Sequence, residues 1–303
     1  MPQPLVILCP GQGAQVVGMG RDLLTVPAAR RCFDLASELL GFDLADVCLN
    51  GPQEKLNQTD ISQPALFTCG VASYHAAVEQ GKLSPAELTD VAGLSLGEYT
   101  ALHLANVLSF EDGVRLVSAR GRFMQEAAVA TPSGMVAIIG ADDTQLAELI
   151  SAAKGDDVLV PANYNAPGQV VLSGSKAACE RAVAIAGERG IKAVPLAVAG
   201  AFHSPIMQVA ADRMGQVLDA VAFRPPACRV WSNVTGQPHG DDLAEIKRRL
   251  VEQIIAPVRW EQTMVALNGQ LPEARYVELA PGRTLAGLAK RVNRRLAIES
   301  LGG

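Results

Sequence analysis

The stretch DVAGLSLGEYTALHLA, residues 90–105, joins the end of a buried strand (90–93) to a helix (96–105). The pentapeptide GLSLG lies at the junction, and a G-x-S-x-G sequence in that position makes a sharp turn that exposes the serine hydroxyl. Small residues must flank the serine because the turn is strained. An ordinary strand-to-helix turn, with Ser95 near a helix N-terminus, is the alternative. The first interpretation makes Ser95 a candidate nucleophile.

Short β-rich runs alternate with helix-length amphipathic stretches along the rest of the chain, which is typical of a mostly parallel sheet covered by helices. Residues 5–9 predict a buried first strand, and residues 63–80 predict a helix. Ser109, with Asp112 three residues later, predicts the start of another helix that runs to about Val129. The fold class is therefore α/β.

Residues 135–197 follow a different order, βαββαβ, which is that of a ferredoxin-like unit. Its strands are expected at 135–139, 158–163, 169–173 and 192–196, and its helices at 144–154 and 176–189. We expect residues 131–198 to form a small domain inserted into a larger one made of residues 1–130 and 199–303. A cleft is expected between the two, because ligand sites often form at domain interfaces.

Composition excludes several classes of protein. The chain has 303 residues, of which 49% are apolar and 19% charged, so it is long and apolar enough for a packed globular core. Its formal net charge of -5 gives no general attraction for nucleic acid or anionic lipid. No run of 18 apolar residues is present, and we expect a cytoplasmic protein that binds neither membrane nor nucleic acid.

The cysteines and histidines do not form a metal-binding pattern. The six cysteines include no C-x-x-C pair, and the four histidines are scattered, so we expect reduced, mostly buried thiols and no metal. His203, in the loop where the chain re-enters the large domain, is the candidate base for Ser95. His75 and His103 fall inside helical patterns and His239 in a turn, so a structural or solvated role is expected for them.

Arg120 lies on the apolar stripe of the helix over residues 110–129, between Leu116 and Met124 at four-residue spacing. A guanidinium turned toward the core needs a buried anion beside it. That anion is either a carboxylate of the protein or part of a substrate, and the sequence leaves both open.

The glycine-rich turn PGQGAQ, residues 10–15, follows the first strand. Val16 stands where a dinucleotide-binding loop needs its third glycine, and Met19 stands where a P-loop needs lysine. Both nucleotide sites are thereby excluded. Either the turn brings backbone N–H groups and the Gln12 side chain close to a ligand, or it is a plain tight turn.

Five motifs together resemble those of the malonyl-CoA:acyl carrier protein transacylase family, which is related to the acyltransferase domains of polyketide synthases. They are PGQGAQ (10–15), GLSLGEY (93–99), RGRFMQ (120–125), NYNAPGQ (163–169) and GAFHS (200–204). The resemblance covers nearly the whole chain. It implies a hydrolase-like α/β large domain that carries a ferredoxin-like insertion.

The resemblance also implies a mechanism. Ser95 would be the nucleophile and His203 its base, oriented by the backbone carbonyl of Gln253. The backbone N–H groups of Gln12 and Leu96 would form the oxyanion hole. A malonyl group would pass from malonyl-CoA to Ser95 and then to the phosphopantetheine thiol of holo acyl carrier protein, in a ping-pong reaction that supplies extender units for fatty acid synthesis and needs no metal or cofactor.

The substrate contacts are implied in the same way. Arg120 would clamp the malonyl carboxylate, and Phe202 would restrict the room for an α-methyl group. Asn165 would contact the pantetheine arm, although a turn-forming asparagine explains it equally well. Leu94 departs from the family, because many members have histidine before the serine. Any polar role of that position is absent here.

Docking of an acidic carrier protein needs a basic surface. Lys290, Arg291, Arg294 and Arg295 are expected to lie on the last helix, after the Pro-Gly pair at 281–282. The resemblance places docking near Lys290 and Arg291, while a solvated helical face is the alternative interpretation. A monomer is expected.

Two other functions stay open at this point. A serine hydrolase would use the same Ser95 and His203 with water as the second acceptor, although a general esterase has no use for a buried Arg120. A non-catalytic subunit that only docks the carrier protein is the second, and the intact set of candidate residues argues against it.

Overall fold

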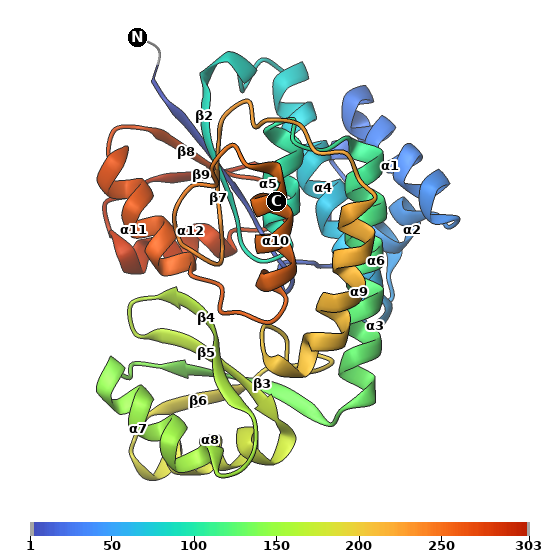
Figure 1. The fold of residues 1–303 in the computed structure, drawn as a ribbon. Coiled ribbons are helices and arrows are strands. Elements are labelled where there is room, and N and C mark those ends of the chain that lie inside the picture. Colours follow the sequence, from blue (N-terminus) through green and yellow to red (C-terminus); the bar gives the residue numbers. More distant parts are fainter. Residues whose placement is uncertain (1–2, 302–303) are drawn as a thin grey trace.

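The computed structural model describes residues 3–301 and contains two β-sheets (Figure 1). The larger sheet has five strands in the order β7-β2-β1-β8-β9, and every neighbouring pair is parallel. The parallel core that the alternating pattern predicts is therefore present. Its strands are β1 (Leu5–Cys9), β2 (Leu88–Gly93), β7 (Arg229–Trp231), β8 (Arg275–Glu278) and β9 (Ile298–Ser300).

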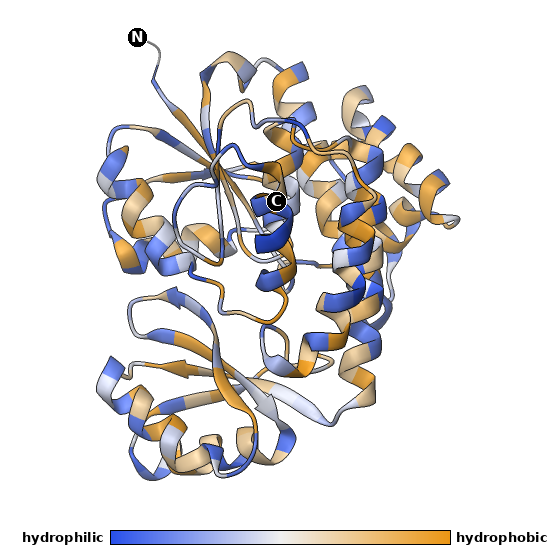
Figure 2. Ribbon diagram, in the orientation of Figure 1, coloured by the Kyte–Doolittle hydropathy of each residue, from blue (hydrophilic) through white to orange (hydrophobic). Residues whose placement is uncertain are grey.

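Helices cover both faces of this sheet. Leu5, Ile7 and Cys9 of the central strand pack on one face, while Val6 and Leu8 pack on the other, so the whole strand is apolar. The core on the first side includes α1 (Pro27–Leu40), α4 (Thr59–Glu79), α5 (Gly97–Leu104), α6 (Phe110–Ala130), α9 (Gln208–Asp219) and α10 (Leu243–Gln253), of which α5 packs directly on the strands, and the core on the second side includes α11 (Trp260–Gln270) and α12 (Thr284–Val292). Figure 2 shows the central strands as mostly hydrophobic and the outer helices as a mixture of hydrophobic and hydrophilic residues.

The remaining short elements of the larger unit are α2 (Leu44–Asn50), α3 (Gln53–Leu56) and three 3-10 turns at Leu23–Thr25, Pro85–Glu87 and Pro205–Met207. Within residues 3–301, no helix is both long and apolar enough to cross a membrane. Of the cysteines described there, all are free thiols and all but Cys228 are buried.

The second sheet is antiparallel, with the strand order β4-β5-β3-β6. Its elements follow the chain in the order β3 (Ser133–Ile139), α7 (Asp143–Lys154), β4 (Leu159–Ala166), β5 (Gln169–Ser175), α8 (Lys176–Glu188) and β6 (Lys192–Pro195). This is the βαββαβ order expected from the sequence. The two helices pack on one face of the sheet, and backbone hydrogen bonds between β4 and Val258 join this sheet to the rest of the molecule.

Two predicted helix boundaries are wrong. The helix expected over 63–80 begins at Thr59, because the Thr59 N–H donates to the Gln125 side chain of α6 at 3.2 Å and so finds a partner outside its own helix. The last helix ends at Val292, so Arg294 and Arg295 lie beyond it. The Asn293 side chain accepts from the Arg295 N–H at 2.9 Å and stabilises a turn there.

The predicted helix start at Ser109 is confirmed. The Ser109 hydroxyl accepts from the backbone N–H of Asp112 at 3.0 Å, which satisfies one of the unpaired donors of the first turn of α6. This helix carries Arg120 toward the centre of the molecule.

Candidate active site

Ser95 lies on the turn between β2 and α5 in the left-handed backbone region, with φ 53°. The two flanking glycines have no room for a side chain. A Cβ at Gly97 would lie 2.1 Å from the Cys9 carbonyl oxygen, and one at Gly93 would lie 1.9 Å from the Gly97 backbone. The sharp turn expected from G-x-S-x-G is therefore present, and both glycines are required by close backbone approach.

His203 follows Ser95 by 108 residues in the sequence and lies beside it in the fold. Its Nε2 lies 2.8 Å from the Ser95 Oγ, and its Nδ1 lies 2.7 Å from the backbone carbonyl oxygen of Gln253. A carbonyl oxygen can only accept, so Nδ1 carries the hydrogen and Nε2 is free to accept the serine proton. Burial, and then the charge of Arg120, lower the pKa of His203 to about 4, so the ring is neutral at pH 7.

Arg120 is only 1% exposed, and its guanidinium donates to the Gln63 Oε1 at 2.9 Å, the Gln253 Oε1 at 2.9 Å and the Ser95 Oγ at 3.1 Å. Burial lowers the pKa of the guanidinium, but its cation has no carboxylate within 4.0 Å among residues 3–301. The sequence left two candidates for the anion beside Arg120, a protein carboxylate and a substrate group. The described residues place no carboxylate there. The guanidinium lacks an ionic partner next to a serine hydroxyl.

A pocket of about 530 Å³ opens at this point. It contains Ser95, His203 and Arg120 and is also lined by residues of the second sheet, of the loops after β1 and β2, and of α12. The other lining residues relevant here are Gln12, Leu94, Met124, Asn163, Asn165, Phe202, Thr284 and Leu288.

Six of the predicted site residues line this pocket, and Gln253 contacts two of them, His203 and Arg120. Phe202 and Asn165 line it, and the Asn165 Oδ1 is buried without a protein partner. The backbone N–H groups of Gln12 and Leu96 have no acceptor within residues 3–301 and remain available. Leu96, Gln253, Lys290 and Arg291 do not line the pocket.

Lys290 and Arg291 are exposed and do not line the pocket. Their helix, α12, does contribute Thr284 and Leu288 to it. The basic pair therefore belongs to the element that borders the pocket.

Four further residues support the site, and the sequence predicted no site role for any of them. Gln63 bonds Arg120, and the Asn233 Oδ1 accepts the Ser95 N–H at 2.6 Å. Glu98 and His239 are buried and pair with each other at 2.7 Å, so the solvated alternative for His239 is wrong. Only Glu98 has a sequence signal, a carboxylate directly after the second glycine of GLSLG.

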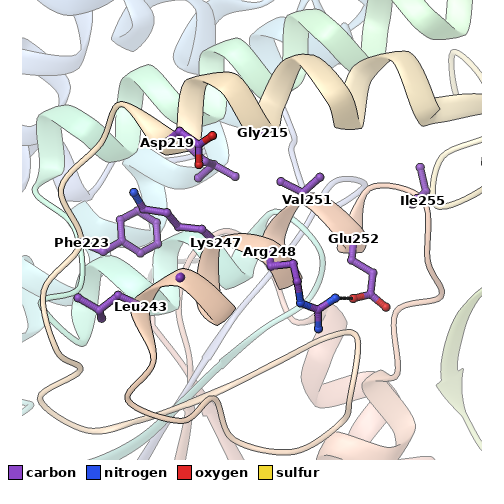
Figure 3. A pocket seen from close by; sticks show the side chains of 11 residues that line it. Gly215, Asp219, Phe223, Leu243, Lys247, Arg248, Val251, Glu252 and Ile255 are labelled. Atoms are coloured by element: carbon purple, nitrogen blue, oxygen red, sulfur yellow. Dashed lines mark hydrogen bonds and ion pairs between the residues drawn. The ribbon is translucent and has the colours of Figure 1, made fainter.

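A larger concavity of about 740 Å³ lies between α9 and α10, and Figure 3 shows its lining. It contains none of the predicted site residues. Three of its charged groups are already engaged: the Lys247 Nζ donates to the Val221 carbonyl at 2.7 Å, and Arg248 pairs with Glu252 at 2.8 Å. The candidate site is therefore chosen by the chemistry around Ser95 and not by the size of the cavity.

The chain is similar to known proteins along most of its length. The family described as acyl transferase domain matches residues 6–294. The malonyl CoA-acyl carrier protein transacylase of Bacillus subtilis (strain 168) is 42% identical over 295 residues, covering 96% of this chain and 91% of the relative. That of Escherichia coli (strain K12) is also 42% identical, over 296 residues, covering 96% and 94%.

Solved structures are similar over the whole chain. The malonyl-CoA:acyl carrier protein transacylase of Xanthomonas oryzae pv. oryzae has a TM-score of 0.93 and 41% identity, covering 99% of this chain and 95% of that one. A malonyl-transacylase solved in complex with its type II PKS acyl-carrier protein has a TM-score of 0.93 and 37% identity, covering 99% and 96%.

Proposed function

Because this chain belongs to the acyl transferase domain family, we propose that it transfers a malonyl group from malonyl-CoA to the phosphopantetheine thiol of holo acyl carrier protein, through a malonyl ester on Ser95. One observation carries the proposal. The Ser95 Oγ is in hydrogen-bond contact with both a neutral imidazole and a guanidinium that lacks a carboxylate partner within residues 3–301. The product would supply extender units for fatty acid synthesis.

The proposed acylation needs only groups of the chain. The Ser95 Oγ attacks the thioester carbonyl carbon while its proton passes to the His203 Nε2, and that proton then leaves with the CoA sulfur. The second half runs in reverse, with the carrier protein thiol as the attacking group. The proposal requires no metal or bound cofactor.

The backbone N–H groups of Gln12 and Leu96 would stabilise the tetrahedral oxyanion. A single donor of this kind is worth on the order of 3 kcal/mol, or roughly 100-fold in rate. Loss of one should therefore slow transfer without abolishing it.

Arg120 would bind the free carboxylate of the malonyl group. Its desolvation is already complete in the free protein, so an anionic substrate group gains a strong charge-assisted hydrogen bond there. An acetyl group would leave the cation without that partner. Phe202 and Asn165, which line the same pocket, would bound the acyl group and the pantetheine arm.

We also infer the domain architecture from the strand orders. The antiparallel order β4-β5-β3-β6 with two helices on one face supports a ferredoxin-like domain over residues 131–198. The parallel sheet with a nucleophile turn after β2 supports a hydrolase-like large domain over residues 1–130 and 199–303.

The test is an intact-mass measurement. The purified protein is incubated with malonyl-CoA, the adduct is mapped by peptide fragmentation, and holo acyl carrier protein is then added. Malonyl on Ser95 that moves to the carrier protein is the expected result, and Ser95→Ala should take up none. Release of free malonate alone would instead indicate a hydrolase, and a folded protein with no adduct would contradict the proposal.

A further inference from the structure

Glu98 is a buried carboxylate behind the nucleophile, and it does not line the substrate pocket. It lies in the first turn of α5, three residues after Ser95. Its Oε2 accepts from the Gln253 Nε2 at 2.7 Å and from the Asn233 backbone N–H at 3.1 Å, and its Oε1 pairs with the His239 Nε2 at 2.7 Å. No partner of this carboxylate is on the surface.

The contact with Gln253 determines the orientation of that side-chain amide. The Nε2 also donates to the Ser95 carbonyl oxygen at 3.0 Å, and both of its partners can only accept. The other end of the amide must therefore be the oxygen, and it is this atom that accepts from Arg120 at 2.9 Å. In the flipped amide, an NH₂ group would face the guanidinium, donor against donor.

The same carboxylate supports the nucleophile through Asn233. The Asn233 side chain accepts from the Ser95 N–H at 2.6 Å and donates to the Gly93 carbonyl oxygen at 2.7 Å. These two hydrogen bonds span the strained turn. The Glu98 Oε2 in turn accepts from the backbone N–H of Asn233. One carboxylate thus orders the partners of both Ser95 and Arg120.

We propose that Glu98 is a positioning residue that sets the amide of Gln253 and, through it, aims Arg120 at the acyl group. The inference rests on the proposed function, because it assigns the effect to the preference for malonyl over acetyl. The length of the Glu98 side chain is the property that matters, because its carboxylate must extend to the Gln253 Nε2.

Two substitutions separate the effect of the length of the Glu98 side chain from the effect of its charge. Glu98→Asp keeps the charge and shortens the side chain by one methylene, which withdraws the acceptor from Gln253. Glu98→Gln keeps the reach and removes the charge. Its oxygen can still accept from Gln253, because the His239 Nδ1 is buried with no partner and the imidazole can move its hydrogen there and accept at Nε2.

The measurement is the ratio of the acylation kcat/KM for malonyl-CoA to that for acetyl-CoA. This ratio does not change with the fraction of folded protein, so a merely structural role of Glu98 would leave it unaltered. We expect Glu98→Asp to lower the ratio about tenfold, the effect of weakening one hydrogen bond to a charged group. We expect Glu98→Gln to stay within about threefold of the wild type, since one neutral acceptor replaces a charged one.

Asp90→Asn is the matched control. Asp90 is another fully buried carboxylate, on β2, and it bonds Trp231 and Arg229 rather than any group at the pocket. This variant should have a lower free energy of unfolding than the wild type and the same ratio of kcat/KM for malonyl-CoA to kcat/KM for acetyl-CoA.

The outcomes are distinct. If the wild type prefers malonyl and Glu98→Asp retains that preference, the positioning role is wrong while the proposed function stands. If Glu98→Gln loses the preference as fully as Glu98→Asp, side-chain length alone does not account for the effect and the inference is also wrong. If the wild type takes up neither acyl group, the proposed function fails and the inference fails with it.

Discussion

At the scale of single residues, backbone strain is concentrated at the proposed reacting pair. Ser95 and His203 both have positive φ, 53° and 57°, which is uncommon for residues other than glycine. Such conformations cost on the order of 1–3 kcal/mol each and persist only where the surroundings impose them. Here Asn233 and Gln253 hold the serine backbone from its N–H and its carbonyl.

The depressed pKa of His203 predicts an unusual pH profile. With a pKa of about 4, the ring stays neutral and able to accept a proton down to acidic pH, whereas a histidine at its ordinary pKa near 6.5 would lose about tenfold in rate at pH 5.5. We expect acylation kcat/KM to be flat between pH 7.5 and 5.5. A malonyl-pantetheine thioester is the substrate of choice, because it has no phosphate that titrates near pH 6.

The same shift predicts how stability changes with pH. The folded-state pKa lies below the unfolded one, so the unfolded chain binds the proton more readily, and the contribution of His203 is complete above pH 6.5 and is lost as the pH falls toward 4. Urea unfolding should show this slope, and His203→Gln should reduce it. An equal slope in both proteins would contradict the assignment.

Arg120 predicts a selectivity change. Arg120→Ala should lower acylation by malonyl-CoA about 100-fold and change acylation by acetyl-CoA little, because only the malonyl carboxylate loses its partner. Arg122→Ala is the matched control: it removes an exposed arginine from the same helix, paired with Glu126. An unchanged malonyl preference in Arg120→Ala would show that the carboxylate binds elsewhere.

At the scale of elements, the position of Arg120 depends on how closely α4 and α6 pack. A Cβ at Gly121 would lie 2.6 Å from the Thr59 carbonyl oxygen, and one at Gly113 would lie 2.2 Å from the Phe67 ring. The two glycines let α6 approach α4, and α4 in turn supplies Gln63 to Arg120. The site therefore depends on a helix contact that contains no catalytic atom.

Gly121→Ala tests this contact. The added methyl group meets backbone rather than a flexible side chain, so we expect a loss of about 1–3 kcal/mol in the free energy of unfolding and a lower acylation rate. Gly187→Ala in α8 is the control, since its Cβ would meet nothing within 4 Å. Alanine should stabilise that helix slightly or leave it unchanged. Equal stability of the two variants, measured by chemical denaturation, would exclude close packing as the reason for Gly121.

At the scale of the whole molecule, the pocket exists only because the second sheet, the loops after β1 and β2, and α12 meet. Ser95 and Arg120 come from the larger unit, Asn163 and Asn165 from β4, and Leu288 from α12. Lys290 and Arg291, which are exposed, lie on the same helix as Leu288.

Charge reversal on α12 tests where the carrier protein docks. Lys290→Glu with Arg291→Glu should raise the KM for carrier protein about tenfold or more and leave acylation by malonyl-CoA unchanged, because two favourable charges become repulsive. Arg30→Glu with Arg31→Glu is the control, an adjacent exposed basic pair on α1, which Figure 1 places on the other side of the molecule. The same KM in both double variants would remove α12 from the docking surface.

Local sequence determined most of the elements and the chemical core of the site. The apolar run of β1, the cap at Ser109 and the glycines around Ser95 act over a few residues, so they predict structure without knowledge of the rest. Arg120 was identifiable because a cation on an apolar stripe is costly unless something pairs with it. The family motifs then connected it with Ser95 and His203.

Tertiary structure alone decided the supporting contacts. Glu98 meets Gln253 across 155 positions of sequence and His239 across 141, and no periodic pattern records such a pairing. The early start of α4 has the same origin, since its first N–H is satisfied by Gln125 of another helix. Periodicity specifies which face of an element is buried, but the partner of a buried polar group is set only when distant segments pack together.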